Sequence, residues 1–400
     1  MVKTPIYFDH AATTPLSRTV LEKMTPYFSD NFGNANSQHV FGRNAVKAVD
    51  EARDEIASLV GAKSSEIYFT SGGTESDNWA LRGVCEAQKN KGKHIIVSKI
   101  EHPAVLKTAK ELEKHGFEVT YLDVEPNGIV NVETLKKAIR PDTILIGVMF
   151  VNNEVGTIQP IREIAKIAHE HGIVCFTDAV QATGVLNIDV KELGVDLLSC
   201  SAHKFYGPKG IGFLYVRTGV KIASIITGGE QERNRRGGTT DTPLIVGMAA
   251  ALKEATDNRE ENNEYVTRLR DRFINRVLDE IPYVTLNGDR YQRIPSNADF
   301  SFHYIEGESI LFSLDLAGIA VSSGSACSSG SLEPSHVLLA MGVDEATAHG
   351  SIRFSFGKHN TTEEVDYAVD KLKEIVGRLR AMSPLFNNKG EIKECCTMIK

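Results

Sequence analysis

Short apolar runs alternate with amphipathic helical segments from about residue 45 to residue 220, and this alternation constrains the fold more than any other feature. The apolar runs are Ile67–Phe69, Ile95–Val97, Val119–Leu122, Ile144–Val148, Ile173–Phe176, Leu197–Leu198 and Ile211–Val216. Strands that alternate with helices form a mostly parallel sheet covered on both faces, so we predict an α/β fold. Glycines between the last two runs favour a hairpin there.

The pattern changes after the last of these strands. LIVGMAAALKEAT, an apolar-periodic helix, runs into the polar stretch NREENNE and then into a second helical pattern. The simplest interpretation is one long helix that leads from one domain into another. We therefore predict a large domain of residues 15–260, a small α+β domain of residues 1–14 and 261–385, and a disordered tail of residues 386–400.

Composition and charge exclude several classes of protein. The chain has 45 Lys+Arg and 52 Asp+Glu in 400 residues, and its net charge of −7 argues against a nucleic-acid binder. No apolar run approaches the roughly 20 residues that span a bilayer, and the first residues lack the apolar stretch of a signal peptide. The six cysteines form no CxxC pair and no disulfide framework. We therefore expect a protein of the reducing cytoplasm without a membrane partner.

Two polar residues each follow a predicted strand. Asp178 ends the run IVCFT, and Lys204 comes just after DLLSCSAH. Ligands of open parallel sheets bind at the carboxyl ends of the strands, so both side chains are expected at one crevice. A lysine that forms a Schiff base and an aspartate that keeps a pyridine nitrogen protonated suit pyridoxal 5'-phosphate (PLP). Most such residues are only solvated or capping groups, so this pair alone is a weak signal.

Neighbouring segments strengthen this interpretation. TSGGTES, residues 70–76, follows a strand and opens a helix, and its glycines and free amides can hold a phosphate. Ser201 and His203 add a hydroxyl and an imidazole beside Lys204. His102 precedes a helix that starts with proline, where its ring can stack on a pyridine and exchange protons with substrate.

Cys327 lies in a segment of unusual composition. Residues 322–336, SSGSACSSGSLEPSH, contain seven serines and two glycines. Such a segment buries little, so we expect it to be mobile and its thiol to be accessible, as a nucleophile requires. Cys85, Cys175 and Cys200 lie in apolar-periodic segments and are expected to be buried hydrophobes.

Twelve segments follow one another in the order typical of NifS/IscS-type cysteine desulfurases, which are class-V aminotransferases. They are YFDHAATTP, FGNANSQHVFG, FTSGGTESDNWA, EHPAV, VNNEVGTIQPI, TDAVQATG, SAHKFYGPKGIG, GGEQERNRRGGT, YIEGESI, SSGSACSSGSLEPSH, AHGSIRFSFG and RLRAMSPL. The chain resembles this family over about residues 5–385. The resemblance implies the PLP-dependent aspartate-aminotransferase fold (fold type I), with a mostly parallel seven-stranded sheet in the large domain.

The resemblance also implies the residues around the cofactor ring. Lys204 matches the Schiff-base lysine, Asp178 the partner of the pyridine nitrogen, and His102 the stacked acid/base. Gln181 matches the donor to the phenolic oxygen of the cofactor, and Asn153 a contact to cofactor and substrate.

The same resemblance implies the two anion contacts. The phosphate is expected at Gly73, Thr74, Ser201 and His203. Thr239 matches a phosphate contact from the second subunit of a homodimer. The substrate carboxylate is expected at Asn153 and Arg353, since a guanidinium binds a carboxylate bidentately. Asn34 is a further substrate contact, although GNANS replaces the family's GNPSS; His10, in HAATT, is another departure from the family pattern.

The family's reaction converts L-cysteine to L-alanine and leaves the sulfur on the enzyme as a persulfide. Here the persulfide is expected on Cys327, with transfer to an iron–sulfur cluster scaffold of the NifU/IscU type or another sulfur acceptor. Cys327 is also the candidate metal ligand, as a transient iron–sulfur ligand shared with the scaffold. Cys395 and Cys396 have no counterpart in the family. A sulfur relay and a metal site are open alternatives for this vicinal pair, but we expect solvated thiols in a disordered tail.

Two alternatives differ in what they require of these residues. A selenocysteine lyase or another PLP-dependent transferase would use the same fold, but an aminotransferase needs no thiol on a long mobile segment. Selenocysteine activity stays open. A sulfur carrier or assembly platform with a vestigial PLP site would have lost Lys204, Asp178 or His102, and all three are present.

Overall fold

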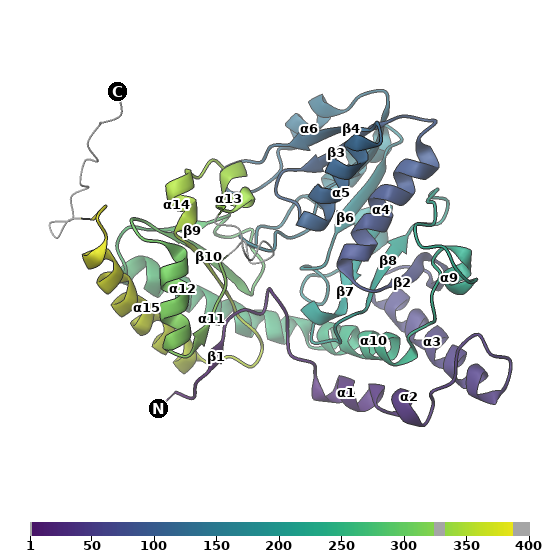
Figure 1. Cartoon of the computed structure of the whole chain (residues 1–400), viewed down its shortest axis with the longest axis horizontal. Helices are drawn as coiled ribbons and strands as arrows, with labels where there is room; N and C mark the ends of the chain where they lie inside the picture. The colour runs from purple at the N-terminus through teal and green to yellow at the C-terminus, as the bar shows by residue number, and fades with distance from the viewer. Residues whose placement is uncertain (1, 324–332, 387–400) are drawn as a thin grey trace.

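The computed structural model describes residues 2–323 and 333–386. The described strands form a seven-stranded, a three-stranded and a two-stranded sheet. Figure 1 shows the seven-stranded sheet and its covering helices as one half of the molecule, and the three-stranded sheet with its long helices as the other. Within the described residues, no helix has the length and apolar character needed to cross a membrane.

The seven-stranded sheet contains the apolar runs that the sequence singled out. Its strands are β2 (Ile67–Thr70), β3 (His94–Ser98), β4 (Glu118–Leu122), β5 (Thr143–Gly147), β6 (Val174–Asp178), β7 (Leu197–Ser201) and β8 (Gly212–Val216), in the order β2-β8-β7-β6-β5-β3-β4. β8 runs antiparallel to both of its neighbours, and the other pairs are parallel. The predicted mostly parallel seven-stranded sheet and the hairpin between β7 and β8 are therefore confirmed.

Helices cover both faces of this sheet, and side chains of one strand alternate between two cores. On β3, Ile96 packs into the core that includes α3 (Val40–Leu59), α7 (Ile161–Glu170) and α10 (Thr242–Asp257). Ile95 and Val97 pack on the other face, against α4 (Gly73–Gln88) and α5 (Pro103–Lys114). Burial on both faces explains why the strands read as continuous apolar runs. The remaining helices of this half are α1 (Arg18–Met24), α2 (Pro26–Ser29), α6 (Val132–Ala138), α8 (Val190–Leu193) and α9 (Gln231–Asn234).

The second half has its own aromatic core. β12 (Ser351–Ser355), β10 (Asn297–Phe302) and β9 (Val284–Asn287) form an antiparallel sheet in that order, packed with α11 (Arg259–Glu280), α12 (Gly307–Leu316) and α15 (Thr362–Met382). Phe8, Phe273 and Phe354 meet in its centre. β1 (Ile6–Tyr7) adds the N-terminal segment by pairing with β11 (Ile319–Ala320), and α13 (His336–Ala340) and α14 (Glu345–His349) complete it. The domain bounds stay a prediction.

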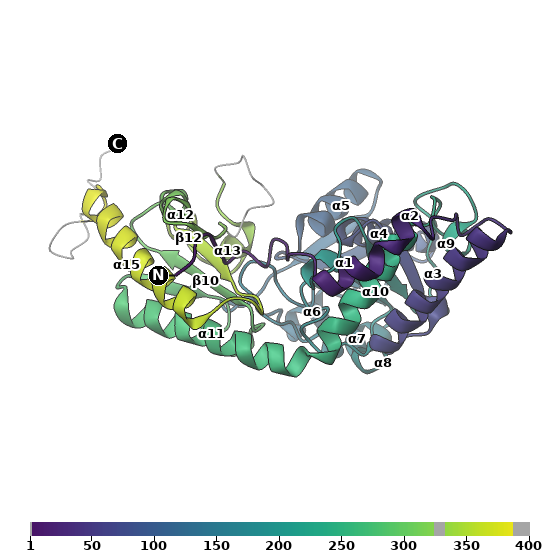
Figure 2. The same ribbon diagram turned by 90° about the horizontal axis from the view of Figure 1, so that it is seen from below.

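The expectation of one long helix after β8 is wrong in its detail. α10 ends at Asp257 and α11 begins at Arg259, because Asn258 has non-helical backbone angles (φ −108°, ψ 12°). The Asn258 side chain donates to the Glu254 carbonyl at 2.8 Å, which is the local hydrogen bond that asparagine offers in place of helix continuation. The two helices still follow one another along one side of the molecule (Figure 2).

Substitution Thr361→Ala should lower the free energy of unfolding by about 1 kcal/mol. Thr361 Oγ1 accepts from the Glu364 amide at 3.2 Å, and the Glu364 carboxylate accepts from the Thr361 amide, so both ends of this capping box are satisfied. Urea denaturation followed by circular dichroism measures the change. Thr361→Ser keeps the acceptor and should stay close to the parent; equal losses in both variants would contradict the capping role.

Candidate active site

A cavity of about 300 Å³ opens at the carboxyl ends of the central strands. Its lining includes the predicted residues Gly73, Thr74, His102, Asn153, Asp178, Gln181, Ser201, His203, Lys204 and Arg353. These residues come from six separate segments of the sequence: five of them end or follow strands of the seven-stranded sheet, and Arg353 lies on β12 of the three-stranded sheet. Thr239 and Asn34 do not line the cavity.

Lys204 closes a 3₁₀ turn directly after β7. Its ammonium group donates to the carbonyl oxygens of Ala11 (2.5 Å) and Ala12 (2.8 Å). Gln181 Nε2 donates to the same Ala11 carbonyl at 3.0 Å. The N-terminal segment thus holds both side chains by backbone atoms, which the side-chain pattern of the sequence could not reveal.

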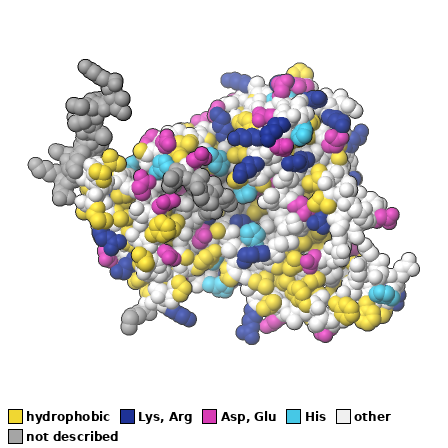
Figure 3. All heavy atoms as spheres, in the orientation of Figure 1, with side chains coloured by type: hydrophobic (Ala, Val, Ile, Leu, Met, Phe, Trp, Pro, Cys, Tyr) yellow, Lys and Arg dark blue, Asp and Glu magenta, His cyan; other side chains and the backbone are white. Residues whose placement is uncertain are grey.

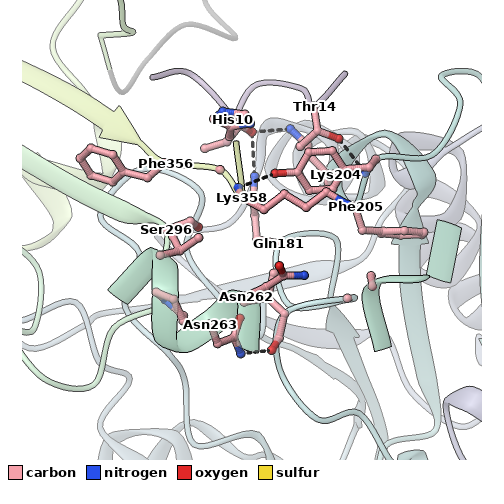
Figure 4. Close-up of a pocket in the computed structure, with 18 of the residues that line it drawn as sticks. His10, Thr14, Gln181, Lys204, Phe205, Asn262, Asn263, Ser296, Phe356 and Lys358 are labelled. Atoms are coloured by element: carbon pink, nitrogen blue, oxygen red, sulfur yellow. Dashed lines mark hydrogen bonds between the residues drawn. The ribbon is translucent and has the colours of Figure 1, made fainter. Parts of the chain in front are cut away.

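A second, smaller cavity of about 80 Å³ lies on the other side of this contact. It shares Ala11, Gln181 and Lys204 with the first cavity, and His10 also lines it (Figure 4). Burial lowers the pKa of His10 to about 4, so this imidazole is neutral near pH 7. Because Ala11 lines both cavities, its segment forms a wall between them.

Asp178 is the last residue of β6 and is buried. Its Oδ1 accepts from the Val180 amide at 2.9 Å. Burial raises the pKa of Asp178, while the nearby His102 and Lys204 lower it. The pKa of Asp178 is raised overall, so the charged carboxylate that a protonated ring nitrogen requires depends on the interactions with His102 and Lys204 that oppose this rise.

His102 forms the N-cap of α5, where its Nδ1 accepts from the Ala104 amide at 3.1 Å. Burial lowers the pKa of His102, although Asp178 opposes this shift. Because Nδ1 is occupied by the backbone, exchange of a proton with a bound molecule has to use Nε2.

The start of α4 offers a cradle for a phosphate. Gly72, with φ +146°, provides no side-chain cap, and the first amides of a helix have no partner within it. A Cβ atom built on Gly73 would lie 2.7 Å from Val180 Cγ2, so only glycine fits there. Glu75, in the first turn, is directed instead to the Ser71 amide and to Arg236.

Arg353 extends from β12 into the opposite wall. Its guanidinium donates to the Asn153 carbonyl (2.8 Å) and to Asp9 (3.0 Å). The Nε atom is buried and has no hydrogen-bond partner within the described residues. A buried donor without a partner is unfavourable, so this side chain is suited to receive an anion.

The donor set therefore fits PLP. The helix cradle matches a phosphate, the buried Asp178 matches a ring nitrogen, and Lys204 lines the same cavity. Arg353 adds a separate place for the carboxylate of an amino acid.

Cys327 lies outside the described residues, as do Cys395 and Cys396 and with them the predicted metal ligand. The residues that flank the undescribed segment 324–332 do contact the cavity wall. Ser322 pairs with Arg353 through both backbone groups (3.2 and 2.7 Å), and His336 Nε2 lies 3.1 Å from the Glu101 carbonyl. The chain thus leaves and re-enters the described structure beside the cavity.

Two predicted contacts lie elsewhere in this chain. Thr239 and Asn34 are both exposed, and Asn34 Oδ1 accepts from the Asn36 amide. For Thr239 this is the placement expected of a residue that serves a second subunit. For Asn34, the contact to substrate stays a prediction.

Some lining residues were not predicted from the sequence. Asp77, Met149 and Val180 line the cavity together with the alanines that hold Lys204. Asp77 lies four residues after Gly73 on α4, and residues at this spacing share one helix face. That spacing was the available signal.

Known proteins resemble the chain over nearly its whole length. The family model for aminotransferase class-V matches residues 6–368. A cysteine desulfurase IscS of Dictyoglomus turgidum is 55% identical over 383 residues, which are 96% of this chain and 97% of that protein. One from Methanosarcina thermophila is 54% identical over 95% of this chain and 94% of that protein.

Solved structures agree with this likeness. A NifS-like protein superposes with a TM-score of 0.89 at 39% identity and covers 94% of this chain and all (100%) of its own. SspA in complex with cysteine superposes with a TM-score of 0.78 at 38% identity, over 89% of this chain and 99% of its own. The expected fold type is thereby confirmed.

Substitution Gly73→Ala should raise the dissociation constant of PLP about tenfold, because overpacking a filled site costs about 1–3 kcal/mol. The added methyl group meets Val180 at the phosphate cradle. Equilibrium dialysis of the cofactor measures the effect. The double variant Gly73→Ala/Val180→Ala removes the collision and should recover most of the affinity; no recovery would contradict the steric explanation.

Proposed function

The chain belongs to the class-V aminotransferase family, and from this we propose that it is a PLP-dependent cysteine desulfurase that converts L-cysteine to L-alanine. The observation that carries the proposal is the cavity itself. It combines Lys204, Asp178 and His102 with Arg353, while the segment that contains Cys327 begins and ends beside it.

The residues that hold the cofactor act at its two ends. The first turn of α4 and Ser201 would bind the phosphate, and Asp178 would pair with the ring nitrogen. Lys204 anchors the cofactor covalently and moves protons at the substrate's Cα. When bound, PLP supplies an electron-accepting ring that allows bonds next to the substrate's amino group to break.

Other side chains bind the substrate. The planar guanidinium of Arg353 donates to the substrate carboxylate, and its bonds to the Asn153 carbonyl and to Asp9 keep it in place. His102 lies on the same cavity wall and exchanges a proton through Nε2, because its Nδ1 is held by the Ala104 amide.

Sulfur abstraction requires a thiolate from Cys327. Its sulfur forms an S–S bond to the substrate sulfur while the substrate's Cβ–S bond breaks. The electron pair of the broken bond stays with the carbon fragment, which takes up a proton and leaves as L-alanine. The enzyme keeps a persulfide on Cys327.

The persulfide is passed to a sulfur acceptor, for which we propose an iron–sulfur cluster scaffold of the NifU/IscU type. Cys327 then also serves as a transient iron–sulfur ligand shared with that scaffold. The sparse, unpaired cysteines of the sequence support a cytoplasmic enzyme.

A homodimer is the assembly that fits the exposed apolar surface. Phe28, Phe32, Val40 and Phe41 are exposed on α2, on the loop after it and at the start of α3. Figure 3 shows hydrophobic side chains gathered in this region, at the lower right. An apolar patch of this kind favours a protein partner, and a second copy of the chain would also bring its Thr239 to the phosphate.

Substitution Cys327→Ser should separate cofactor chemistry from sulfur abstraction. A serine hydroxyl stays protonated near neutral pH, so the variant should keep PLP and its spectral response to cysteine but form no persulfide. Radiolabelled sulfur on the denatured, non-reduced protein measures persulfide. Lys204→Ala is the contrasting variant: turnover should fall by at least about 100-fold with loss of the spectral response.

A matched variant with Cys395→Ser and Cys396→Ser should keep the label. Label retained by Cys327→Ser, or lost only from this tail variant, would move the reactive thiol to the tail and contradict the assignment.

A hybrid dimer tests whether the sites are shared. One chain carries both Lys204→Ala and Thr239→Val, and its partner is wild type. If each site uses Thr239 of the other chain, one site lacks Lys204 and the other lacks Thr239, so the rate should fall well below half of the wild-type rate. Thr239→Val homodimers, which should be impaired, are the control. A hybrid with half of the wild-type rate would show independent sites.

A further inference from the structure

Residues 229–238 form a closed loop between β8 and α10. At the base of this loop the Gly237 amide donates to the Ile226 carbonyl at 3.0 Å, and a Cβ atom built on Gly237 would lie 2.8 Å from the Gly228 Cα atom. Two backbone segments approach this closely only where side chains are missing. The loop, which we call the strap, ends directly before Thr239.

The strap has an unusual backbone. Glu232 (φ 45°, ψ 43°) and Arg233 (φ 57°, ψ 44°) are both left-handed, and Asn234 has a φ of 63°. Such angles are unfavourable for residues other than glycine and rarely follow one another, so other interactions have to hold this turn. Arg233 contributes one of them, because it donates to the Ser64 carbonyl at 2.8 Å.

A buried ion pair holds the first part of the strap. The Nη1 and Nη2 atoms of Arg53, on α3, donate to the two carboxylate oxygens of Glu232, each at 2.8 Å, and the two side chains are 9% and 6% exposed. The Phe69 amide, on β2, also donates to Glu232 (2.9 Å). A planar contact at two points fixes orientation as well as distance. The turn is therefore bound to α3 and to β2, which lie beside α9 in Figure 1.

A second ion pair ties the end of the strap to α4. Arg236 donates through Nε and Nη2 to the two carboxylate oxygens of Glu75, at 2.8 and 3.0 Å. Glu75 lies in the first turn of α4 and also accepts from the Ser71 amide at 2.8 Å. A single carboxylate therefore connects the strap to the turn that forms the phosphate cradle.

Thr239 lies between two fixed points of the chain. It follows Arg236 by three residues and precedes Asp241 by two, and Asp241 caps α10 by accepting from the Leu244 amide at 3.1 Å. Thr239 is exposed, and its hydroxyl forms no hydrogen bond within residues 2–323 and 333–386. The backbone around Thr239 is thus held on both sides, while its hydroxyl is available to a group outside this part of the chain.

We propose that Arg236 and Glu232 are positioning residues, which hold the strap in a preformed shape so that Thr239 reaches the phosphate of PLP in the second subunit. The proposal rests on the proposed function, because it requires a homodimer that binds PLP. A preformed strap loses little conformational freedom when it contacts the phosphate, whereas a loosened strap has to be ordered at the expense of cofactor affinity. Each subunit then determines the PLP affinity of the opposite site.

Hybrid dimers distinguish this role from a purely structural one. One chain keeps Lys204 and the other carries Lys204→Ala, and two different affinity tags isolate the hybrid. Occupancy of the intact site is measured over a range of PLP concentrations by borohydride reduction and mass spectrometry of the Lys204 peptide, which requires no turnover. Arg236→Ala is placed either on the Lys204→Ala chain (trans hybrid) or on the chain that keeps Lys204 (cis hybrid).

The trans hybrid should bind PLP about tenfold more weakly than the hybrid without Arg236→Ala, as expected for one lost hydrogen bond to a charged group. Its intact site receives Thr239 from the loosened strap. The cis hybrid has the same composition but receives Thr239 from an intact strap, so its loss should stay below about threefold. A structural role confined to one chain would weaken the cis hybrid instead.

Further variants in the trans arrangement serve as controls. Thr239→Val sets the loss expected without the hydroxyl, and Arg236→Ala added to that chain should weaken binding no further, because both changes act through one contact. Glu232→Gln, which keeps the shape of the side chain, should resemble Arg236→Ala. Arg235→Ala removes the same charge one residue away, where the guanidinium lies over the Tyr68 ring, and should stay close to the parent.

Equal losses in the cis and trans hybrids would overturn the positioning role. So would an additive loss in the double variant, a Thr239→Val chain without effect, or an Arg235→Ala loss as large as that of Arg236→Ala. If the wild-type protein fails to bind PLP or to form a dimer, the proposed function itself fails. If it does both and the two hybrids do not differ, only the positioning role fails.

Discussion

Parallel hydrogen bonding between β3, β5, β6 and β7 places the carboxyl ends of these strands at one edge of the sheet. The register is fixed because both faces of the strands are buried, and a slip by one residue would exchange the two cores. His102, Asp178 and Lys204 each follow one of these strands within a few residues. Strand pairing therefore brings these three side chains together, and the other residues of the cavity are arranged around them.

The N-terminal segment adds the second constraint. β1 pairs with β11 in one half of the molecule, and a few residues later Ala11 and Ala12 hold Lys204 in the other half. Both carbonyl oxygens accept from the half-buried Lys204 ammonium group, and the Ala11 oxygen also accepts from Gln181. The segment thereby couples the position of the lysine to the packing between the two halves.

The residues that follow strands were predictable from the sequence, because the periodicity of apolar residues and the ends of the apolar runs can be read directly from it. Contacts made by backbone atoms could not be predicted, and the carbonyl groups of Ala11 and Ala12 are the main example. The break at Asn258 was missed because the polar stretch after it still has helical character. Thr239 and Asn34 are exposed in the single chain, and their predicted contacts are to the phosphate of a second subunit and to the substrate.

The cavity separates its positive groups into two places, and we propose that this separation orients a substrate. The amides at the start of α4 attract a phosphate, whereas Arg353 on the opposite wall attracts a carboxylate. Asp9 pairs with Arg353, and Arg353 Nε remains without a partner in the described residues, so the guanidinium keeps a buried donor for one further anion. When the substrate carboxylate binds Arg353 and the amino group reaches toward Lys204, the side chain is the part of the substrate that remains unbound. The described residues on either side of 324–332 contact the wall at Arg353 and beside His102, and the proposed function requires the Cys327 thiol to reach a substrate sulfur in that position.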